Sequence, residues 1–340
     1  MFFLTKDESE IFYEISYSND NSLLLTNGHE NYLFTDGRYF EEARVAAKNC
    51  EVILSASSLF KTAAQIARKE RIKKLVFDPK NTTHADFLEL QKLSSGFLYP
   101  QKGALSKKRA IKRDDELEKI KTAAKIGKKG FKRFAEKLNS LNSEPDEFAL
   151  NYLARERLSF KGSYETSFDP ITAIDENAAN PHARATSKKL KKESLILFDG
   201  GVKFERYCSD RTRTARFEDG FEFKKSQHFK DAKLQRIYDV VLAAQEAAIN
   251  AAKPGVRAKE LDKTARDVIE KAGYGEYFVH SLGHGVGLDI HEYPYINKKS
   301  DEILQENMVF TIEPGVYIPG FYGVRIEDMV VLTNSGAKVL

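Results

Sequence analysis

The feature that most constrains the fold of this chain of 340 residues is an order of elements that occurs twice. From Leu117 to Leu138, apolar residues recur at alternating steps of three and four, which predicts an amphipathic helix. A second helix opens at Pro145, with Phe148 among its inward side chains, and strand-like segments follow as far as Phe198. Two helices and a strand-rich stretch then return at an offset of roughly 115 residues, which suggests an internal duplication.

The chain before this duplicated part predicts a smaller domain. Residues 22–25 and 32–35 look like strands, and residues 60–68 look like a helix, so we expect an α/β domain over residues 1–106. Residues 107–113 are basic and lack apolar periodicity, and we interpret them as a linker. Residues 114–340 then form the second domain, in keeping with the usual size of domains.

Composition excludes several classes of protein. Hydrophobic residues make up 41% and charged residues 31% of the chain, as in ordinary globular proteins, and a net charge of +4 is too small to indicate a nucleic-acid partner. The apolar runs are much shorter than the roughly 20 residues that span a bilayer. The first residues lack the pattern of a secretory signal, and Cys50 and Cys208 have no metal-binding spacing. We expect a cytoplasmic protein that binds neither membrane nor nucleic acid.

Two aspartates mark the strands of the first half. Asp199 ends the apolar run in Leu-Phe-Asp-Gly-Gly, and Asp210 lies in Cys-Ser-Asp-Arg-Thr-Arg-Thr. If residues 198–214 form an antiparallel hairpin that turns at residues 204–205, Asp199 and Asp210 face each other across the strands. The sequence therefore predicts one pair of facing carboxylates in the first half.

Two glutamates repeat this arrangement in the second half. Glu313 lies in Thr-Ile-Glu-Pro-Gly and Glu327 in Arg-Ile-Glu-Asp. They face each other if the last hairpin turns at Gly320, where glycine provides the backbone conformations that tight turns need. Like charges about 5 Å apart repel unless something positive lies between them. Each half is thus predicted to deliver a carboxylate pair that needs a cation.

Divalent metal ions meet that need. The four carboxylates and His284, in Gly-His-Gly-Val-Gly, are the oxygen and nitrogen ligands that suit manganese, cobalt or zinc. Carboxylates can also bridge two metals roughly 3.5–4 Å apart, with a shared hydroxide as the nucleophile. A single acidic residue in a strand is more often a surface charge. The joint pattern favours a site for two metals.

These motifs resemble a known family. Asp-Gly-Gly, Ser-Asp-x-Thr-Arg, His-x-x-Gly-His-Gly-x-Gly, Glu-Pro-Gly and Arg-Ile-Glu-Asp, in this order, are similar to those of the pita-bread metallopeptidases, which include methionine aminopeptidase, aminopeptidase P and prolidase. The resemblance covers about residues 114–340. It implies an α+β pita-bread catalytic domain with pseudo-twofold duplication, preceded by a smaller creatinase-like α/β N-terminal domain.

The resemblance also implies how the ligands are shared. Asp199 and Asp210 would chelate one metal ion, while Asp210, His284 and Glu313 would hold the other, and Glu327 would bridge both. The expected cofactors are two divalent ions, manganese in the first place, with cobalt or zinc as alternatives.

Four further roles follow from the resemblance and from general chemistry. His182 and His291 match positions that contact substrate and support the tetrahedral intermediate, and His280 matches one that lines the pocket, although each histidine alone is more often structural. Glu313 would act as general base as well as ligand. Arg325, two residues before a predicted ligand, would orient a ligand carboxylate.

The N-terminal domain selects a branch of the family. Its Thr-Asp-Gly-Arg-Tyr segment, residues 35–39, followed by a helix over residues 41–47, is similar to the extra domain of aminopeptidase P and prolidase. We expect a homodimeric, metal-dependent Xaa-Pro aminopeptidase whose substrates are peptides with proline in second position. The alternative is a prolidase that cleaves Xaa-Pro dipeptides. A metal-free peptide-binding module and a creatinase-like hydrolase of small amidines are disfavoured by the intact ligand set.

Overall fold

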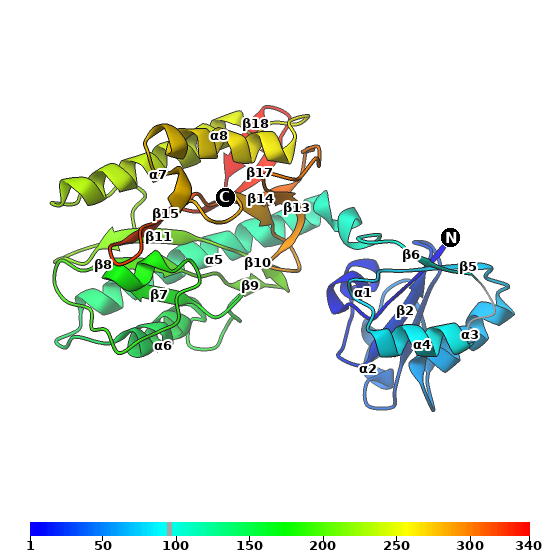
Figure 1. Cartoon of the computed structure of the whole chain (residues 1–340). Helices are drawn as coiled ribbons and strands as arrows, with labels where there is room; N and C mark the ends of the chain where they lie inside the picture. Colours follow the sequence, from blue (N-terminus) through cyan, green and yellow to red (C-terminus); the bar gives the residue numbers. More distant parts are fainter. Residues whose placement is uncertain (94–96) are drawn as a thin grey trace. The chain divides into compact units, whose positions relative to one another are not determined.

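A computed structural model describes residues 1–93 and 97–340 and divides the chain into two compact units, Met1–Arg109 and Ala110–Leu340 (Figure 1). Each unit has its own sheets and its own hydrophobic clusters. Both cysteines are free thiols. Within the described ranges, no helix combines the length and the hydropathy that a membrane span requires.

The first unit is built on a six-stranded sheet with the order β4-β3-β2-β1-β5-β6. Strands β1, β2 and β3 pair antiparallel, and the remaining pairs are parallel. The strands are β1 (Phe2–Thr5), β2 (Ser22–Thr26), β3 (Asn31–Thr35), β4 (Glu51–Leu54), β5 (Lys74–Phe77) and β6 (Phe97–Pro100). The helices are α1 (Glu8–Ile15), α2 (Phe40–Ala46), α3 (Leu59–Lys69) and α4 (His84–Leu93).

Helices cover both faces of this sheet, as β2 shows. Successive side chains of a strand point to opposite faces. Leu23 and Leu25 join the cluster that contains Phe60 of α3, whereas Leu24 joins the cluster that contains Ile11 of α1. The strands and helices that the sequence predicts here are present, with ends that shift by at most one residue.

The second unit repeats a helix pair followed by strands. The first copy consists of α5 (Asp114–Asn139), α6 (Glu147–Leu158), β7 (Ile171–Ile174), β8 (Leu195–Asp199), β9 (Lys203–Phe204), β10 (Tyr207–Cys208) and β11 (Thr212–Arg216). The second consists of α7 (Ala232–Ala251), α8 (Ala258–Lys271), β12 (Gly283–Gly285), β13 (Glu292–Ile296), β14 (Val309–Ile312), β15 (Gly315–Tyr317), β16 (Gly323–Arg325), β17 (Asp328–Thr333) and β18 (Gly336–Val339). Short 3-10 helices span Ser106–Ala110, Asp175–Ala179 and Gly275–Tyr277.

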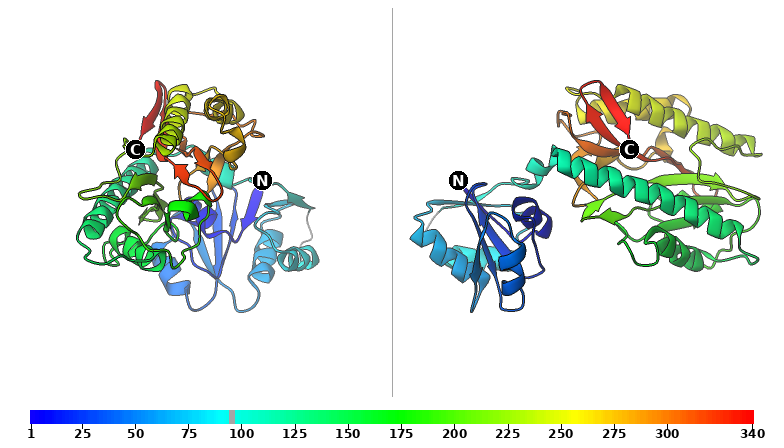
Figure 2. Two further views of the ribbon diagram at one scale, coloured as in Figure 1. Left: turned by 60° about the vertical axis from the view of Figure 1, so that its left-hand side comes forward. Right: turned by 180° about the vertical axis from the view of Figure 1, so that it is seen from behind.

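Strand β8 lies between the two hydrophobic cores of this unit. Leu195 and Leu197 belong to the cluster that α7 and α8 cover, and Ile196 and Phe198 belong to the cluster that α5 and α6 cover. Figure 2 shows these two helix pairs on either side of the strands. Burial on both faces explains the unbroken apolar run of β8. The first polar side chain after this run, Asp199, is only 9% exposed.

One predicted inward side chain is wrong. Phe148 is 59% exposed, as is Tyr152 one turn further along α6, at 71%. The residues of α6 that face the core are Leu150, Ala154 and Leu158, which recur at steps of four. Phe148 precedes this stripe by two residues, so it points away from the core at about 100° of rotation per residue.

The first hairpin has a different register from the predicted one. Asp199 pairs with Thr212, not with Asp210. The turn falls at Glu205 and Arg206, whose φ angles are 46° and 73°. A two-residue turn of this type needs positive φ at both central positions, and the prediction had centred the turn one residue too early. The shift of the centre by one residue moves every cross-strand partner by two.

The register of the second hairpin is confirmed. Ile312 pairs with Asp328 in β14 and β17, and Gly315 pairs with Arg325 in β15 and β16, all in the register that places Glu313 opposite Glu327. The chain turns at Gly320, whose φ is 71°. The glycine therefore marks the turn, as expected from its freedom to adopt positive φ.

Candidate metal centre

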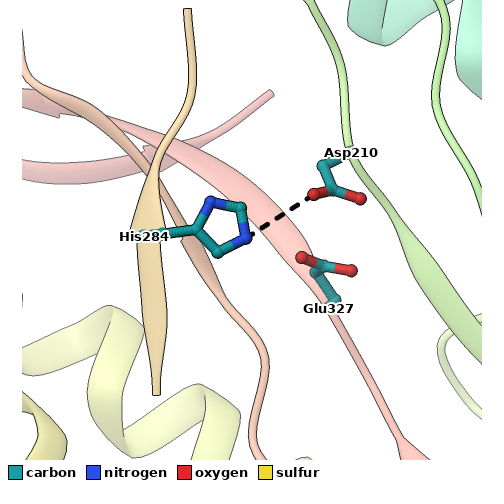
Figure 3. A group of neighbouring side chains, drawn as sticks. All are labelled: Asp210, His284 and Glu327. Atoms are coloured by element: carbon teal, nitrogen blue, oxygen red, sulfur yellow. Dashed lines mark ion pairs between the residues drawn. The ribbon is translucent and has the colours of Figure 1, made fainter. Parts of the chain in front are cut away.

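Three predicted ligands converge in the middle of the second unit. Side-chain ligand atoms of Asp210, His284 and Glu327 all lie within 4.8 Å of one another. Asp210 follows β10, His284 lies on β12, and Glu327 connects β16 to β17. Figure 3 shows the three side chains pointing toward one another from these separate elements. The centre thus takes residues from both halves of the duplication.

Two glycines of the motifs permit this convergence. A Cβ atom on Gly201 would lie 1.7 Å from the carbonyl oxygen of Ser209, the residue before Asp210. A Cβ atom on Gly283 would lie 2.0 Å from the carbonyl oxygen of Thr311. Real Cβ atoms do not approach that closely, so the backbones that carry Asp210 and His284 can reach their positions only because glycine stands there.

Glu313 approaches the same nitrogen of His284 as Asp210 does. The His284 Nε2 atom is 3.4 Å from Glu313 Oε1 and 3.7 Å from Asp210 Oδ2. Thr311 holds this arrangement, because its hydroxyl accepts the His284 backbone N–H at 3.1 Å and contacts Glu313 Oε1 at 3.4 Å. His284 Nε2 therefore faces carboxylates from both hairpins.

His284 is a neutral imidazole with a defined tautomer. Its Nδ1 atom lies 3.2 Å from the carbonyl oxygen of Gly285, and since a carbonyl only accepts, Nδ1 carries the proton. Burial, and next the nearby His291, lower the pKa of His284 to about 3. Nε2 thus presents its lone pair to the carboxylates, as a metal-ligating histidine does when a carbonyl fixes its other nitrogen.

The carboxylates repel one another in a buried space. Burial, followed by the charges of Asp199 and Glu313, raises the pKa of Asp210 well above its usual value. Burial, followed by the charges of Asp210, Glu313 and Asp199, does the same for Glu327. Burial also raises the pKa of Glu313 to about 8, although Arg325 opposes this shift. Ionised together, these groups require positive charge among them.

Buried oxygens without partners show where that charge fits. Among the described residues, Asp199 Oδ1 and Asp210 Oδ1 are buried and accept no hydrogen bond. A buried carboxylate oxygen normally has a partner, and divalent cations bind such oxygens together with a neutral imidazole. The donor set of this centre therefore fits a divalent metal ion.

Arg325 joins the two hairpins beside the centre. It is buried, and its Nη2 donates to Asp199 Oδ2 at 2.8 Å. Burial alone would lower its pKa, but the Tyr317 oxygen and the carboxylates of Asp199, Glu313 and Glu327 raise the pKa well above its usual value. The guanidinium therefore stays charged next to Asp199, and the role of Arg325 in orienting a metal ligand stays a prediction.

His280 belongs to a chain of hydrogen bonds that starts at Arg325. Arg325 Nη1 donates to the Tyr317 hydroxyl at 3.0 Å, and this hydroxyl lies 2.9 Å from His280 Nε2. His280 Nδ1 faces the carbonyl oxygen of Ser281 at 2.8 Å. Burial, and next Arg325, lower the pKa of His280 to about 4, so the neutral Nε2 accepts a hydrogen bond from the Tyr317 hydroxyl. The pocket role of His280 remains a prediction.

The other two histidines lie at the exposed side of the site. The His291 ring lies 4.2 Å from the His284 ring between centroids, and the pKa of His291 is lowered by burial and next by His182. Arg325 Nη1 donates to the carbonyl oxygen of Pro181, which precedes His182 in the chain. Both histidines are exposed and therefore accessible to a substrate.

Sequence reasoning missed two groups of this site. Thr212 is fully buried and its hydroxyl contacts Glu327, and Tyr317 connects Arg325 to His280. Thr212 is visible in Ser-Asp-x-Thr-Arg, but its role follows from the register of the first hairpin. Tyr317 carried no signal beyond its position in a strand.

The comparisons define the class of protein. The family model described as "Metallopeptidase family M24" matches residues 118–334, and the model "Creatinase/Prolidase N-terminal domain" matches residues 1–111. The chain belongs to metallopeptidase family M24. The α+β pita-bread fold with a smaller N-terminal domain, which the motifs predicted, is confirmed.

Proteins similar to this chain include Xaa-Pro peptidases. An Xaa-Pro dipeptidase of Lactobacillus delbrueckii subsp. lactis is 35% identical, over 99% of this chain and 87% of its own length. The structure of an Xaa-Pro dipeptidase from Bacillus anthracis matches with a TM-score of 0.90 and 32% identity, over 99% of this chain and 92% of that one. An X-Pro aminopeptidase from Thermotoga maritima matches with a TM-score of 0.86 and 30% identity, over 99% and 94%.

Proposed function

We propose that this protein is a metal-dependent Xaa-Pro dipeptidase, a prolidase. The observation that carries the proposal is the group of Asp210, His284 and Glu327 at the centre of a chain that matches Xaa-Pro dipeptidases along nearly its whole length. The prolidase alternative of the sequence analysis fits these relatives better than the aminopeptidase that we expected first.

Five residues would hold the metal ions. Asp199, Asp210, His284, Glu313 and Glu327 supply the oxygens and the imidazole nitrogen, and two divalent ions, manganese first, balance their charge. Bound there, divalent metal polarises the scissile carbonyl and makes water a nucleophile at neutral pH.

Two histidines would stabilise the negative charge that develops on the oxygen of the scissile carbonyl. That oxygen gains negative charge when water adds to the carbonyl carbon, so donors placed beside it lower the barrier. His291 is exposed next to His284, and its lowered pKa keeps it neutral, with one N–H to donate. Arg325 donates to the carbonyl oxygen of Pro181, next to His182 in the chain, and His182, close enough to lower the pKa of His291, would contact the substrate beside it.

Glu313 would move the proton. Hydrolysis breaks the C–N bond, adds the water oxygen to carbon, and leaves a proline nitrogen that must gain a proton. Glu313 lies 3.4 Å from His284 Nε2 at the proposed metal site, and with metal bound its ionised carboxylate would take a proton from water and pass it to the proline nitrogen. Arg325 keeps Asp199 oriented throughout.

The substrate amide explains why proline would be accepted. A bond before proline is a tertiary amide with no N–H. A peptidase that requires a hydrogen bond from that N–H rejects such a bond, because one of its own buried groups then stays unpaired. We propose that this site places no acceptor at that point.

Liquid chromatography of peptide digests tests the function. The purified chain, supplied with manganese, is incubated with an Xaa-Pro dipeptide, an Xaa-Pro-Pro tripeptide and an Xaa-Ala-Ala tripeptide. We expect cleavage of Xaa-Pro with little release from the tripeptides. Faster release from Xaa-Ala-Ala than from either proline peptide would reject proline specificity.

The second candidate is an Xaa-Pro aminopeptidase. The likeness to the X-Pro aminopeptidase from Thermotoga maritima favours it, because that structure covers nearly the same length of this chain. The same digests decide, since preferential release of the first residue from Xaa-Pro-Pro selects the aminopeptidase.

The proposal also covers the oligomeric state and the cellular location of the protein. We propose a homodimer, which sedimentation of the purified protein tests, and a cytoplasmic location, where a reducing environment would keep Cys50 and Cys208 as the free thiols observed. Cell fractionation tests the location.

A further inference from the structure

Thr212 connects the two hairpins at the metal centre. It begins β11 opposite Asp199, and its side chain is fully buried. Its hydroxyl lies 2.7 Å from Glu327 Oε2 and 3.0 Å from Arg325 Nε. Its carbonyl oxygen also accepts the backbone N–H of Glu327 at 3.1 Å. One residue of the first half thus contacts two residues of the second.

The direction of these hydrogen bonds is determined by chemistry. An arginine guanidinium has donors and no acceptor, so the Thr212 hydroxyl must accept from Arg325 Nε. The single hydroxyl proton is then left for Glu327 Oε2. Because Arg325 also donates to Asp199 Oδ2, the hydrogen bonds that start at Arg325 reach one predicted ligand, Asp199, directly and another, Glu327, through the Thr212 hydroxyl.

We propose that Thr212 is a positioning residue for the metal centre. Its hydroxyl holds Oε2 of Glu327 in place, so that the carboxylate presents its remaining electron pairs toward Asp210 and His284. Without the hydroxyl, Glu327 could rotate and Arg325 would lose one partner. Residues that orient metal ligands typically contribute 10–100-fold to metal affinity or activity. This inference rests on the proposed metal site and not on the identity of the peptide substrate.

The chain offers a matched control two residues away. Thr214 is fully buried on the same strand and, by the period of a strand, on the same face. Its hydroxyl donates to the backbone carbonyl of Arg325 at 3.0 Å and accepts the backbone N–H of Arg325 at 3.1 Å. Thr214 therefore anchors the Arg325 backbone, whereas Thr212 contacts the side chains of Arg325 and Glu327.

The experiment compares Thr212→Val, Thr212→Ser and Thr214→Val. The binding constant for Mn²⁺ is measured by calorimetry with a competing chelator on metal-free protein, beside the melting temperature of the same metal-free samples. We expect Thr212→Val to weaken Mn²⁺ binding by about 10–100-fold. We expect Thr212→Ser, which keeps the hydroxyl, to stay within about threefold of the unchanged protein, and Thr214→Val to lower the melting temperature without a comparable loss of affinity.

Three results would overturn the proposal. They are unchanged Mn²⁺ affinity in Thr212→Val, an equal loss of affinity in both valine variants, and a serine variant as weak as the valine variant. Because Mn²⁺ binding is measured without peptide, failure of this inference is distinguishable from failure of the proposed dipeptidase activity, which the peptide digests test.

Discussion

The two hairpins of the second unit both carry predicted metal ligands, but their strands pair in different registers. In the hairpin of β8 and β11, Asp199 faces Thr212, and Asp210 is displaced from Asp199 by two residues. In the hairpin of β14 and β17, the pairs on either side place Glu313 opposite Glu327. A displacement of two residues keeps side chains on one face of a sheet, whereas a displacement of one would turn them away. Both hairpins can therefore direct carboxylates to one centre.

The difference has a consequence for the charges. The displacement leaves room opposite Asp199 for Thr212, a neutral donor, and Arg325 from the second hairpin reaches Asp199. No arginine among the described residues donates to the carboxylate of Asp210 in the first hairpin or to those of the two glutamates in the second, and burial together with neighbouring carboxylates raises the pKa of all three. Asp199 is thus paired with Arg325 of the second hairpin, whereas the other three carboxylates depend more on an external cation.

Removal of the metal should have the largest effect on peptidase activity, because both hairpins carry predicted ligands. A chelator should abolish peptidase activity, and manganese or cobalt should restore it, because four buried carboxylates need cations to remain ionised together. Metal analysis should find two ions per chain. Activity that persists in the chelator-treated, metal-free protein would contradict the centre.

The next largest effect is expected for Asp210, the residue of the first hairpin whose carboxylate lies next to His284 and Glu327. Asp210→Asn should lower turnover by about 10³-fold or more and reduce the bound metal, since loss of a ligand removes several kcal/mol of Lewis-acid stabilisation. The fold should persist, as circular dichroism can verify. Full activity with unchanged metal content would remove Asp210 from the ligand set.

His291 lies on neither hairpin and should separate catalysis from metal binding. His291→Ala should lower the turnover number by about 10²–10³-fold, because a donor to the developing negative charge acts mainly in the transition state. Metal content, measured on the same sample, should not change. If metal content fell in step with turnover, His291 would be a metal ligand. Metal binding would then not be confined to His284 and the carboxylates of the hairpins.

The turns should differ in their response to substitution. Gly320→Ala in the second hairpin should lower the free energy of unfolding by about 1 kcal/mol, because an alanine at a φ of 71° is strained. Urea unfolding of the isolated variant measures this change. The control is Gly37→Ala, since Gly37 has no positive φ and a Cβ there meets no atom within 4 Å. An equal loss of stability in both variants would show that backbone strain at the Gly320 turn is not the cause.

The smallest effect is expected at the turn of the first hairpin. Arg206 has a φ of 73°, so Arg206→Gly should raise the free energy of unfolding by about 0.5 kcal/mol through relief of backbone strain. The same urea titration measures it. A loss of stability there would show that the Arg206 side chain contributes more than its backbone conformation costs.

The sequence by itself determined the repeated order of helices and strands, the motifs of the family, and the register of the second hairpin. Periodicity and local turn chemistry carry these properties, since Gly320 marks its own turn through its freedom at positive φ. Only the tertiary structure decided the register of the first hairpin. Glu205 and Arg206 adopt positive φ there, and no glycine in the sequence marks the turn.

The tertiary structure also decided the partners of the ligands and the outward direction of Phe148. The bonds of Arg325 to Thr212 and Asp199 join residues far apart in the chain. No local pattern encodes such contacts, because they form only when the two halves pack together and buried polar groups must find donors and acceptors. Phe148 follows the same rule, since the face of α6 that is buried depends on what packs against it.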